Sequence, residues 1–387
     1  MDYRFLLFAL FIGLQTSFAQ SDNDSSRTQF VTSNGYIKQM QTVLYQPHIN
    51  QVLTDGLFQH RLNATFLPNN NVINLHAGLR SRMFYGNYFE LSPQMGETIH
   101  DQNNDYLKLS FNLIDNKKLL LNTYLDRLYA EFTMDKVEIR VGRQRINWGI
   151  STFWNPNDLF NAYDFTDFDY EERPGADAIR ATWYTGPVSR LEGAIQMADN
   201  WNNVTAAMLY RWNMANFDFQ VIGGKYRNDF IVGGGWSGYL GDIGWKNEFS
   251  YFFSGAQRTF NLSSGFDFSF DNGLFTSIGY LFNELGITNT GTGNLFTFQL
   301  SAKNLYPYRH AIFINANYPF SPILGGGMSV VYSPVEAQPF FISPNLTYSL
   351  AQNWDLDFFS QLFLAKDNSS VIGTDIFAFF LRLRLSM

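Results

Sequence analysis

The sequence predicts an all-β fold, a transmembrane antiparallel β-barrel of about 16–18 strands with one loop folded inward. The first observation is the last eleven residues, where apolar side chains occupy every second position from Phe377 to Met387 and Arg382 and Arg384 lie between them. Similar alternating segments, separated by turn residues, recur along most of the chain. The third observation is an aromatic content of 18% with a mean hydropathy of only −0.17. Alternation of this kind builds a wall with lipid on one side and water on the other.

The N-terminal residues 1–19 are predicted to be a secretory signal peptide. Arg4 precedes an apolar core, Phe5 to Leu14, which is too short to span a bilayer, and we expect the mature chain to begin near Gln20. A retained N-terminal anchor is the alternative. The chain has no cysteine, which excludes disulfides and a lipoprotein anchor, and its formal charge of −7 argues against nucleic-acid partners.

Residues 20–51 are expected to form a polar N-terminal leader, and residues 52–387 a single outer-membrane barrel. The predicted strands are 57–67, 72–84, 106–114, 119–134, 137–147, 178–185, 190–198, 204–212, 216–224, 229–240, 243–253, 258–270, 273–283, 295–304, 310–318, 324–333, 338–349, 354–364 and 375–387. An odd total conflicts with the even number usual for bacterial barrels. We therefore assign the weakest, 295–304, to a long external loop over 284–309, leaving about eighteen strands, with sixteen as the alternative. This count places the long segment 85–105 on the short-turn side, where it is not expected.

The hairpin around Asp135 and Lys136 gives the most local detail. A two-residue turn there pairs Met134 with Val137 and sets Glu131 opposite Arg140, with an apolar opposite face. Beyond Val141 the alternation would direct Arg143 and Arg145 toward lipid. A β-bulge at Gly142 would return both arginines to the lumen, the interior of the barrel. The alternative is that the strand has left the bilayer by Arg143.

Four short motifs carry a family resemblance. They are Val141-Gly142-Arg143-Gln144, Trp148-Gly149, Asn155-Pro156 and Pro174-Gly175-Ala176-Asp177. This segment is similar to the strand and constriction loop of porin-like bacterial outer-membrane barrels, and it most resembles alginate-export-type channels. The resemblance implies a diffusion channel whose long loop after this strand folds inward.

The predicted inward loop, about 149–177, is rich in carboxylates, and the predicted wall is rich in cations. The constriction-loop candidates are Asp158, Asp164, Asp167, Asp169, Glu171 and Glu172. The pore-lining candidates are Arg80, Arg82, Lys108, Glu131, Arg140, Arg143, Arg145, Arg382 and Arg384. An acidic loop facing a basic wall produces a transverse field that favours hydrophilic solutes. The alternatives are a solvated surface loop and a calcium site, although no EF-hand spacing is present.

The predicted function is passive diffusion of small hydrophilic solutes across the outer membrane. The expected partners are outer-membrane lipids and these solutes, with a homo-oligomer left open, and no cofactor or metal is expected. A plugged structural or surface-binding barrel is one alternative. A barrel lipid hydrolase is another, with His76 as its candidate base, but the sequence has no Gly-x-Ser-x-Gly nucleophile motif. His76 is better explained as a polar residue of the lumen wall.

Overall fold

The computed structural model describes residues 30–68, 72–92, 94–161, 174–255, 257–288, 298, 300–336, 338–364 and 375–387. The predicted signal peptide lies outside the described residues. The first strands are β1 (Val31–Gln46), β2 (Gln51–Phe66), β3 (Ile73–Gly86), β4 (Ser110–Asp115), β5 (Leu119–Met134), β6 (Val137–Gln144), β7 (Ala176–Gly186), β8 (Ser189–Gln196), β9 (Thr205–Met214) and β10 (Phe217–Tyr226).

The remaining strands are β11 (Asp229–Leu240), β12 (Ile243–Ser254), β13 (Gln257–Ser269), β14 (Phe275–Asn283), β15 (His310–Ser321), β16 (Leu324–Tyr332), β17 (Phe340–Ala351), β18 (Trp354–Leu364) and β19 (Ile376–Ser386). Short helices are α2 (Asn87–Glu90) and α3 (Met95–Gln102), with 3-10 turns η1 (Pro47–Ile49) and η2 (Trp201–Asn203). Among the described residues, no helix is long and apolar enough to span a bilayer.

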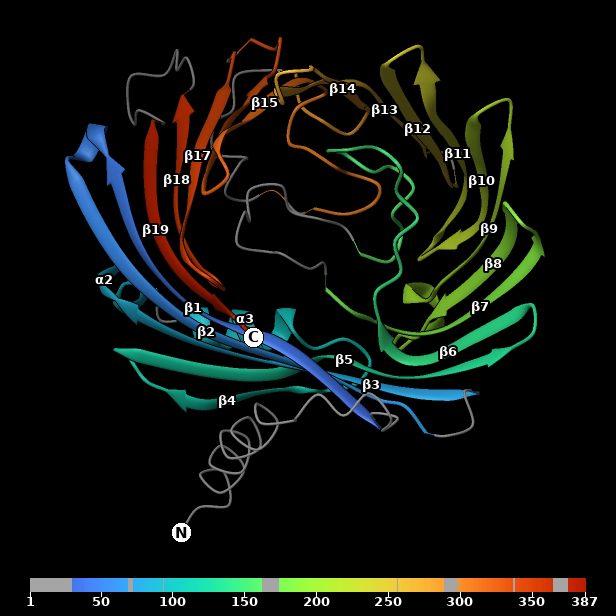
Figure 1. Ribbon diagram of the computed structural model, residues 1–387, viewed down its shortest axis with the longest axis horizontal. Helices are drawn as coiled ribbons and strands as arrows, with labels where there is room; N and C mark the ends of the chain where they lie inside the picture. The colour runs from blue at the N-terminus through green and yellow to red at the C-terminus, as the bar shows by residue number, and fades with distance from the viewer. Residues whose placement is uncertain are drawn as a thin grey trace.

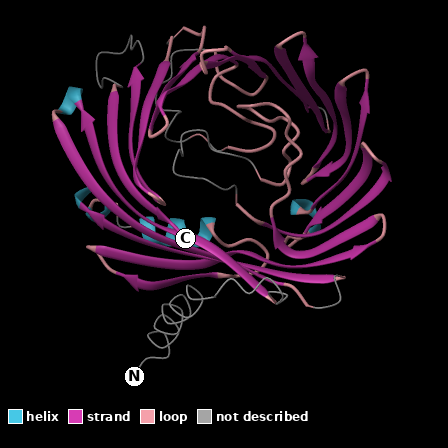
Figure 2. Ribbon diagram, viewed as in Figure 1, coloured by secondary structure: helices cyan, strands magenta, loops and turns pink. Residues whose placement is uncertain are grey.

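The strands close into a ring (Figures 1 and 2). Each wall strand pairs with the next along the chain in antiparallel fashion, β3 pairs directly with β5, and β19 pairs with β1. The result is a closed 18-strand barrel. The strand β4 stands outside this ring and pairs with β5, beyond the point where β6 ends. The predicted fold class is confirmed.

The N-terminal boundary of the barrel differs from the prediction. Residues 20–51 were expected to be a polar leader, but residues 31–46 form β1, which pairs with β2 from Val31 to Gln46 and with β19 from Tyr36 to Tyr45. The segment contains Thr, Ser, Asn, Lys and several Gln, so its polarity concealed a strand. The predicted number of about eighteen wall strands still holds, because β1 was not predicted and is added, while the predicted strand 106–114 corresponds to β4 and is not part of the ring.

The two ends of the barrel carry different connections. Two-residue turns join β5 to β6, β7 to β8, β9 to β10, β11 to β12, β15 to β16 and β17 to β18 at the end where β1 begins and β19 finishes. The connections over 87–118, 145–175 and 284–309 lie at the opposite, long-loop end. The extra strand β1 shifts each later connection to the opposite end of the barrel. The segment 85–105 therefore lies at the long-loop end, where a long connection is expected. No strand separates β14 from β15, which pair directly, so the assignment of 295–304 to a loop is confirmed for its described residues.

The outward face of the wall is apolar and bounded by aromatic rings. Tyr210, Trp212 and Phe219 stack near the short-turn end, with centroids 5.5 Å apart in each pair. Tyr45 and Phe377 lie 6.3 Å apart near the long-loop end. Aromatic girdles flanking an apolar band are typical of barrels in the outer membrane. The exterior of this barrel therefore faces lipid.

The predicted hairpin register is confirmed, but the predicted bulge is wrong. The pairs run without a shift from Met134 and Val137 to Leu128 and Arg143, so Gly142 carries no bulge. Gly142 has a φ of +121°, and a Cβ there would meet the carbonyl of Leu128, so this position requires a residue without a Cβ. The register shift occurs in β5, near Asp126, where Leu125 and Arg127 pair with consecutive residues of β3.

Candidate functional site

Two segments run inside the ring from the long-loop end (Figure 1). We call residues 145–161 the first inward segment and residues 300–309 the second inward segment. Both continue into residues that the structure does not describe. Their contacts with the wall decide where open space remains in the lumen, so each is considered in turn.

The first inward segment is bound to β8, β9 and β10 through Trp148. Its indole N–H donates to Glu192, while Arg211 and Gln220 donate to its backbone carbonyl at 3.1 Å and 2.9 Å. Trp148 is 1% exposed, and Phe160 packs edge-on against its ring. The segment is therefore attached to the wall rather than suspended in the lumen.

Glu248 of β12 is a second attachment point for the same segment. This fully buried carboxylate accepts the backbone N–H groups of Ile150, Ser151 and Asn157, the last at 3.2 Å. Asn157 also donates to the carbonyl of Gly234 at 2.8 Å. One acidic side chain thus organises a turn of backbone in the way that an anion occupies a ring of amide donors.

The second inward segment is attached to β11, β13 and β14. Lys303 forms an ion pair with Asp229 at 2.7 Å, and Asn261 donates to the carbonyl of Lys303 at 3.1 Å. The rings of Tyr306 and Tyr308 are buried, and burial raises the pKa of Tyr308 to about 12, so this phenol is neutral at physiological pH.

The two inward segments meet through aromatic side chains. Phe153 stacks on Phe313 of β15 with centroids 3.9 Å apart, and Trp154 lies 5.6 Å from Tyr306. A buried apolar cluster with Val331 and Leu281 continues this contact. The two segments therefore cover the inner face along β8 to β16. The described inner face from β17 to β3 is the more polar side, and next to it α2 and α3 pack through Phe89 and Ile99 against Leu120 of β5.

A band of basic side chains crosses that polar side. Register places Lys38 of β1 opposite Arg384 of β19, and Arg61 of β2 opposite Arg80 of β3. Arg82 pairs with Gln59, which in turn lies opposite Lys38. We define the basic band as Lys38, Arg61, Arg80, Arg82, Arg382 and Arg384.

Acidic and amide partners order the band. Arg61 pairs with Asp126 at 2.8 Å, Arg382 with Asp357 at 2.9 Å and Arg384 with Asp355 at 2.9 Å. Arg80 donates to Gln59 and Tyr124 at 2.9 Å and 3.2 Å. Lys38, Arg61, Arg80 and Arg382 are buried, whereas Arg82 and Arg384 are partly exposed.

The structure brings some predicted residues together and separates others. Glu131 and Arg140 form an ion pair at 2.8 Å, and Arg140 also contacts Glu138 at 2.9 Å. Arg82 lies against the rings of Phe84 and Tyr124, half-buried on the inner face. Lys108 lies in the connection before β4, exposed, with its ammonium on the carbonyl of Asp105. Arg145 is exposed just after β6.

Arg143 occupies a different place from the one expected. It is 2% exposed and bidentate to Asp177 of β7, at 2.8 Å and 2.7 Å. The remaining donors reach the carbonyls of Asn103, Leu107 and Leu125. Because β6 stops at Gln144, this guanidinium fills the wall where the strand leaves and ties the connection before β4 to β7. Arg143 is therefore a buried residue of the wall.

The acidic constriction-loop residues are only partly described. Asp158 is 2% exposed within the first inward segment. Asp164, Asp167, Asp169, Glu171 and Glu172 lie outside the described residues. The described part of the chain contains no group of three or more side chains suited to hold a metal ion. His76 bonds to Thr65 at 3.1 Å and stacks on Tyr129.

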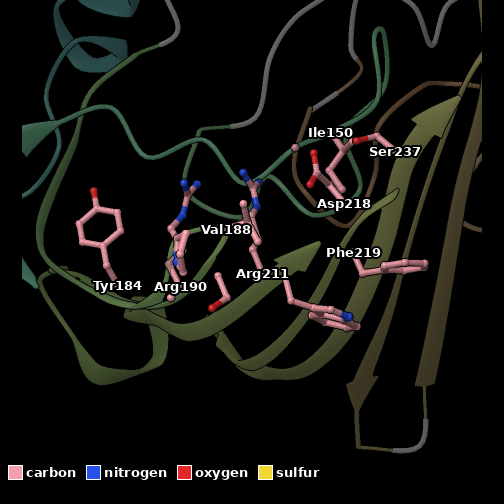
Figure 3. Close-up of a pocket in the computed structure, with 13 residues that line it drawn as sticks. Ile150, Tyr184, Val188, Arg190, Arg211, Asp218, Phe219 and Ser237 are labelled. Atoms are coloured by element: carbon pink, nitrogen blue, oxygen red, sulfur yellow. The ribbon is translucent and has the colours of Figure 1, made fainter. Parts of the chain in front are cut away.

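A cavity of about 430 Å³ lies between the first inward segment and the short-turn ends of β7 to β11 (Figure 3). Arg190 and Arg211, which are directly opposite each other in register, extend from the wall in the same direction, and Asp218 lies beside Ile150. Arg180 and Arg190 both approach Glu192, at 2.8 Å and 3.6 Å. We call Arg180, Arg190 and Arg211 the second basic cluster. Arg190 and Arg211 line the cavity near the short-turn end of the lumen.

The sequence reasoning missed Lys38, Arg61, Arg180, Arg190 and Arg211. Lys38 was overlooked because its strand was assigned to the leader. The others lie on predicted strands, and Arg61, for example, has the polar residues Gln59 and Asn63 two positions away on either side. Applying the inward alternation to every strand, rather than to those near the motifs, would have found them.

The sequence matches no protein-family model and no curated protein. The structure is similar to solved structures of Acinetobacter baumannii OccAB3 (TM-score 0.57, 10% identity, 92% of this chain and 99% of that chain). It is also similar to Acinetobacter baumannii OccAB1 (TM-score 0.58, 8% identity, 95% and 99%) and Pseudomonas aeruginosa OccK11 (OpdR) (TM-score 0.56, 10% identity, 92% and 96%). At such identities the likeness concerns the fold. With its closed wall and apolar exterior, the chain has the fold of a multi-pass β-barrel of the bacterial outer membrane.

Proposed function

We propose that the protein is a passive outer-membrane channel for small hydrophilic solutes, with a preference for anionic groups. The observation that carries the proposal is the basic band, which barrel closure assembles from the first and last strands of the chain. Basic side chains that line a narrow aqueous space raise the local concentration of anions, and Arg82 and Arg384 are the members of the band that are not buried. The second cluster, Arg180, Arg190 and Arg211, would extend this preference toward the short-turn mouth.

The proposed constriction combines two parts. The first inward segment narrows the lumen from the β8 to β12 side, and its undescribed continuation carries the predicted acidic residues. The transverse field expected from the sequence, between an acidic loop and a basic wall, stays a prediction, because all of these acidic residues except Asp158 lie outside the described residues. Arg140, at 26% side-chain exposure and paired with Glu131, is the predicted pore-lining residue that the described contacts best support on the far wall.

Conductance in planar bilayers tests the proposal. We expect purified protein to give discrete ion-conducting steps with a reversal potential on the anion-selective side. Replacing the half-buried pair Arg82 and Arg384 by Gln should shift the reversal potential toward cations. The matched control is Arg227→Gln, a cation at the β10–β11 turn outside the basic band. An equal shift in both variants would contradict a role for the band.

A plugged barrel is the second candidate, because the two inward segments cover about half of the inner face. It predicts closed traces at all voltages in the same recordings. The resemblance to alginate-export-type channels through the Gly142-Arg143-Gln144 region also remains a hypothesis. We assign no catalytic residue, since the contacts of His76 are with Thr65 and Tyr129 and do not include a serine nucleophile.

A further inference from the structure

The outward face of β1, β2 and β3 carries polar side chains in the part of the wall that faces lipid. Gln41 lies directly opposite Leu381 of β19, and Gln39 opposite Leu383. Leu381 is 50% exposed on the outer surface. Residues directly opposite each other in an antiparallel pair project to the same face, so both glutamines point outward.

These glutamines belong to a larger group of polar residues. Gln39 and Gln41 donate to the hydroxyl of Tyr85, at 3.1 Å and 2.8 Å. The tyrosine reaches across β2 because Gly56 lies beneath its ring, where any Cβ would collide with it. We define the outer polar patch as Gln39, Gln41, His60, Ser81, Tyr85 and Thr123, the last of which donates to Ser81 at 3.0 Å.

The depth of the patch matters, because polar residues are common at the membrane surface. The ring pair of Tyr45 and Phe377 marks the girdle at the long-loop end of β1. Gln41 precedes Tyr45 on the same strand and lies about 10 Å deeper, at ~3.4 Å per residue and a strand tilt of ~40°. Gln39 lies deeper still. Both amides therefore fall within the apolar band, which is roughly 25 Å tall.

Hydrocarbon cannot satisfy these amides. A glutamine has two N–H donors and a carbonyl acceptor, and the bond to Tyr85 uses one donor of each. Gln41 is exposed, and an amide without partners in hydrocarbon costs several kcal/mol. The remaining hydrogen-bonding capacity calls for a protein surface against the patch.

Exposed outward positions on other strands of the wall carry apolar side chains. Val221, Ile278 and Ile314 are about half exposed and apolar. Asn247 is an outward-facing amide, but it is 5% exposed and, in its better amide orientation, is satisfied by the indoles of Trp236 and Trp245. Within the outer polar patch, Gln41 thus combines exposure, spare hydrogen-bonding capacity and membrane depth.

We propose that the outer polar patch is the contact surface for a second copy of this chain in the membrane. Copies inserted with the same orientation are related by an axis along the membrane normal, and each presents the same amides to its neighbour. Between transmembrane surfaces, amide and hydroxyl groups form stabilising hydrogen bonds across the contact. This assembly does not depend on what the lumen conducts.

The absence of cysteine makes the test direct. We would place single cysteines at Gln41→Cys and, as the matched control on β10, at Val221→Cys, and treat outer membranes with a flexible bis-maleimide. We expect a cross-linked dimer from Gln41→Cys at several times the yield from Val221→Cys. Equal yields at the two sites, or none at Gln41→Cys, would overturn the proposal.

A second measurement, the mass of the protein in detergent, tests the same contact without cross-linking. The mass of the detergent-solubilised Gln39→Leu/Gln41→Leu double variant should be that of a monomer where the unaltered protein is an oligomer. Heat-modifiable migration on gels verifies that the variant barrel is folded. A monomeric mass for the unaltered protein, or a patch-dependent loss of co-purifying lipid phosphate without a change in mass, would show that a lipid covers the patch and would overturn the proposal.

Discussion

Lys38 lies directly opposite Arg384 across the β1–β19 seam that closes the barrel, so two cations near opposite ends of the chain share one stretch of inner wall. Asp355 accompanies Arg384 at 2.9 Å, and Gln59 lies on the other side of Lys38. Like charges placed opposite each other destabilise a sheet. The ion pair of Arg384 with Asp355 offsets part of this repulsion, and Arg384 is the more exposed of the two cations.

Arg140 and Arg143 should respond differently to replacement. Arg140→Gln removes a half-buried lumen charge, so the reversal potential should move toward cations while the barrel stays folded. Arg143→Gln leaves Asp177 buried without its partner and should leave selectivity unchanged in the protein that folds. Planar-bilayer recordings of both variants check this. A selectivity shift in Arg143→Gln would show that its guanidinium reaches the lumen.

The Arg143–Asp177 pair should make a large contribution to stability. Both side chains are 3% exposed, and removing one partner of such a pair costs ~3–5 kcal/mol. Arg143→Ala should therefore lower the urea midpoint strongly in lipid vesicles. The control is Arg384→Ala, whose ion pair with Asp355 is 30% and 20% exposed and should contribute at most ~1 kcal/mol. Equal losses of stability in the two variants would contradict the conclusion that Arg143 is buried in the wall while Arg384 is partly exposed to the lumen.

Glu248 should control the position of the first inward segment. In Glu248→Leu the backbone N–H groups of Ile150, Ser151 and Asn157 lose their common acceptor, so the segment should detach from β12. We expect faster proteolytic cleavage near residue 150 and a larger, noisier conductance. Glu138→Leu, which alters a partly exposed carboxylate on β6, serves as the control. An unchanged cleavage rate in Glu248→Leu would mean that the aromatic contacts of Phe153 are enough to hold the first inward segment in place.

Gly142 should tolerate no side chain, although it carries no bulge. Its φ of +121° is a conformation that L residues rarely adopt, and a Cβ would meet the carbonyl of Leu128. Gly142→Ala should cost ~1–3 kcal/mol in the free energy of unfolding. Gly223→Ala on β10, where a Cβ meets nothing within 4 Å, is the matched comparison, and similar stabilities for the two would refute the strain argument.

The alternation of apolar and polar residues was enough to predict the barrel, its approximate strand number and the hairpin that sets Glu131 opposite Arg140. It failed at β1, whose outward Gln39 and Gln41 make the strand look like a polar leader. It also failed at Arg143. That residue lies on the face of Val141, but the lipid it would meet is replaced by the connection before β4, which no local pattern reveals.

The basic band could be predicted only in part for a related reason. Arg80 and Arg82 were identified from their strand, and Arg382 and Arg384 from theirs, but alternation gives the face of a residue and not its neighbours. Their proximity depends on the register of β1 with β19, and that pairing exists only in the closed ring.

The same closure bears on how the barrel forms. β1 and β19 are separated by nearly the whole described chain, and contacts of such long sequence separation form slowly because most of the chain must be ordered first. Until they pair, each presents an open row of backbone donors and acceptors, which invites mispairing with other chains. We therefore expect the seam to pair late in assembly, and the basic band is complete only once β1 and β19 have paired.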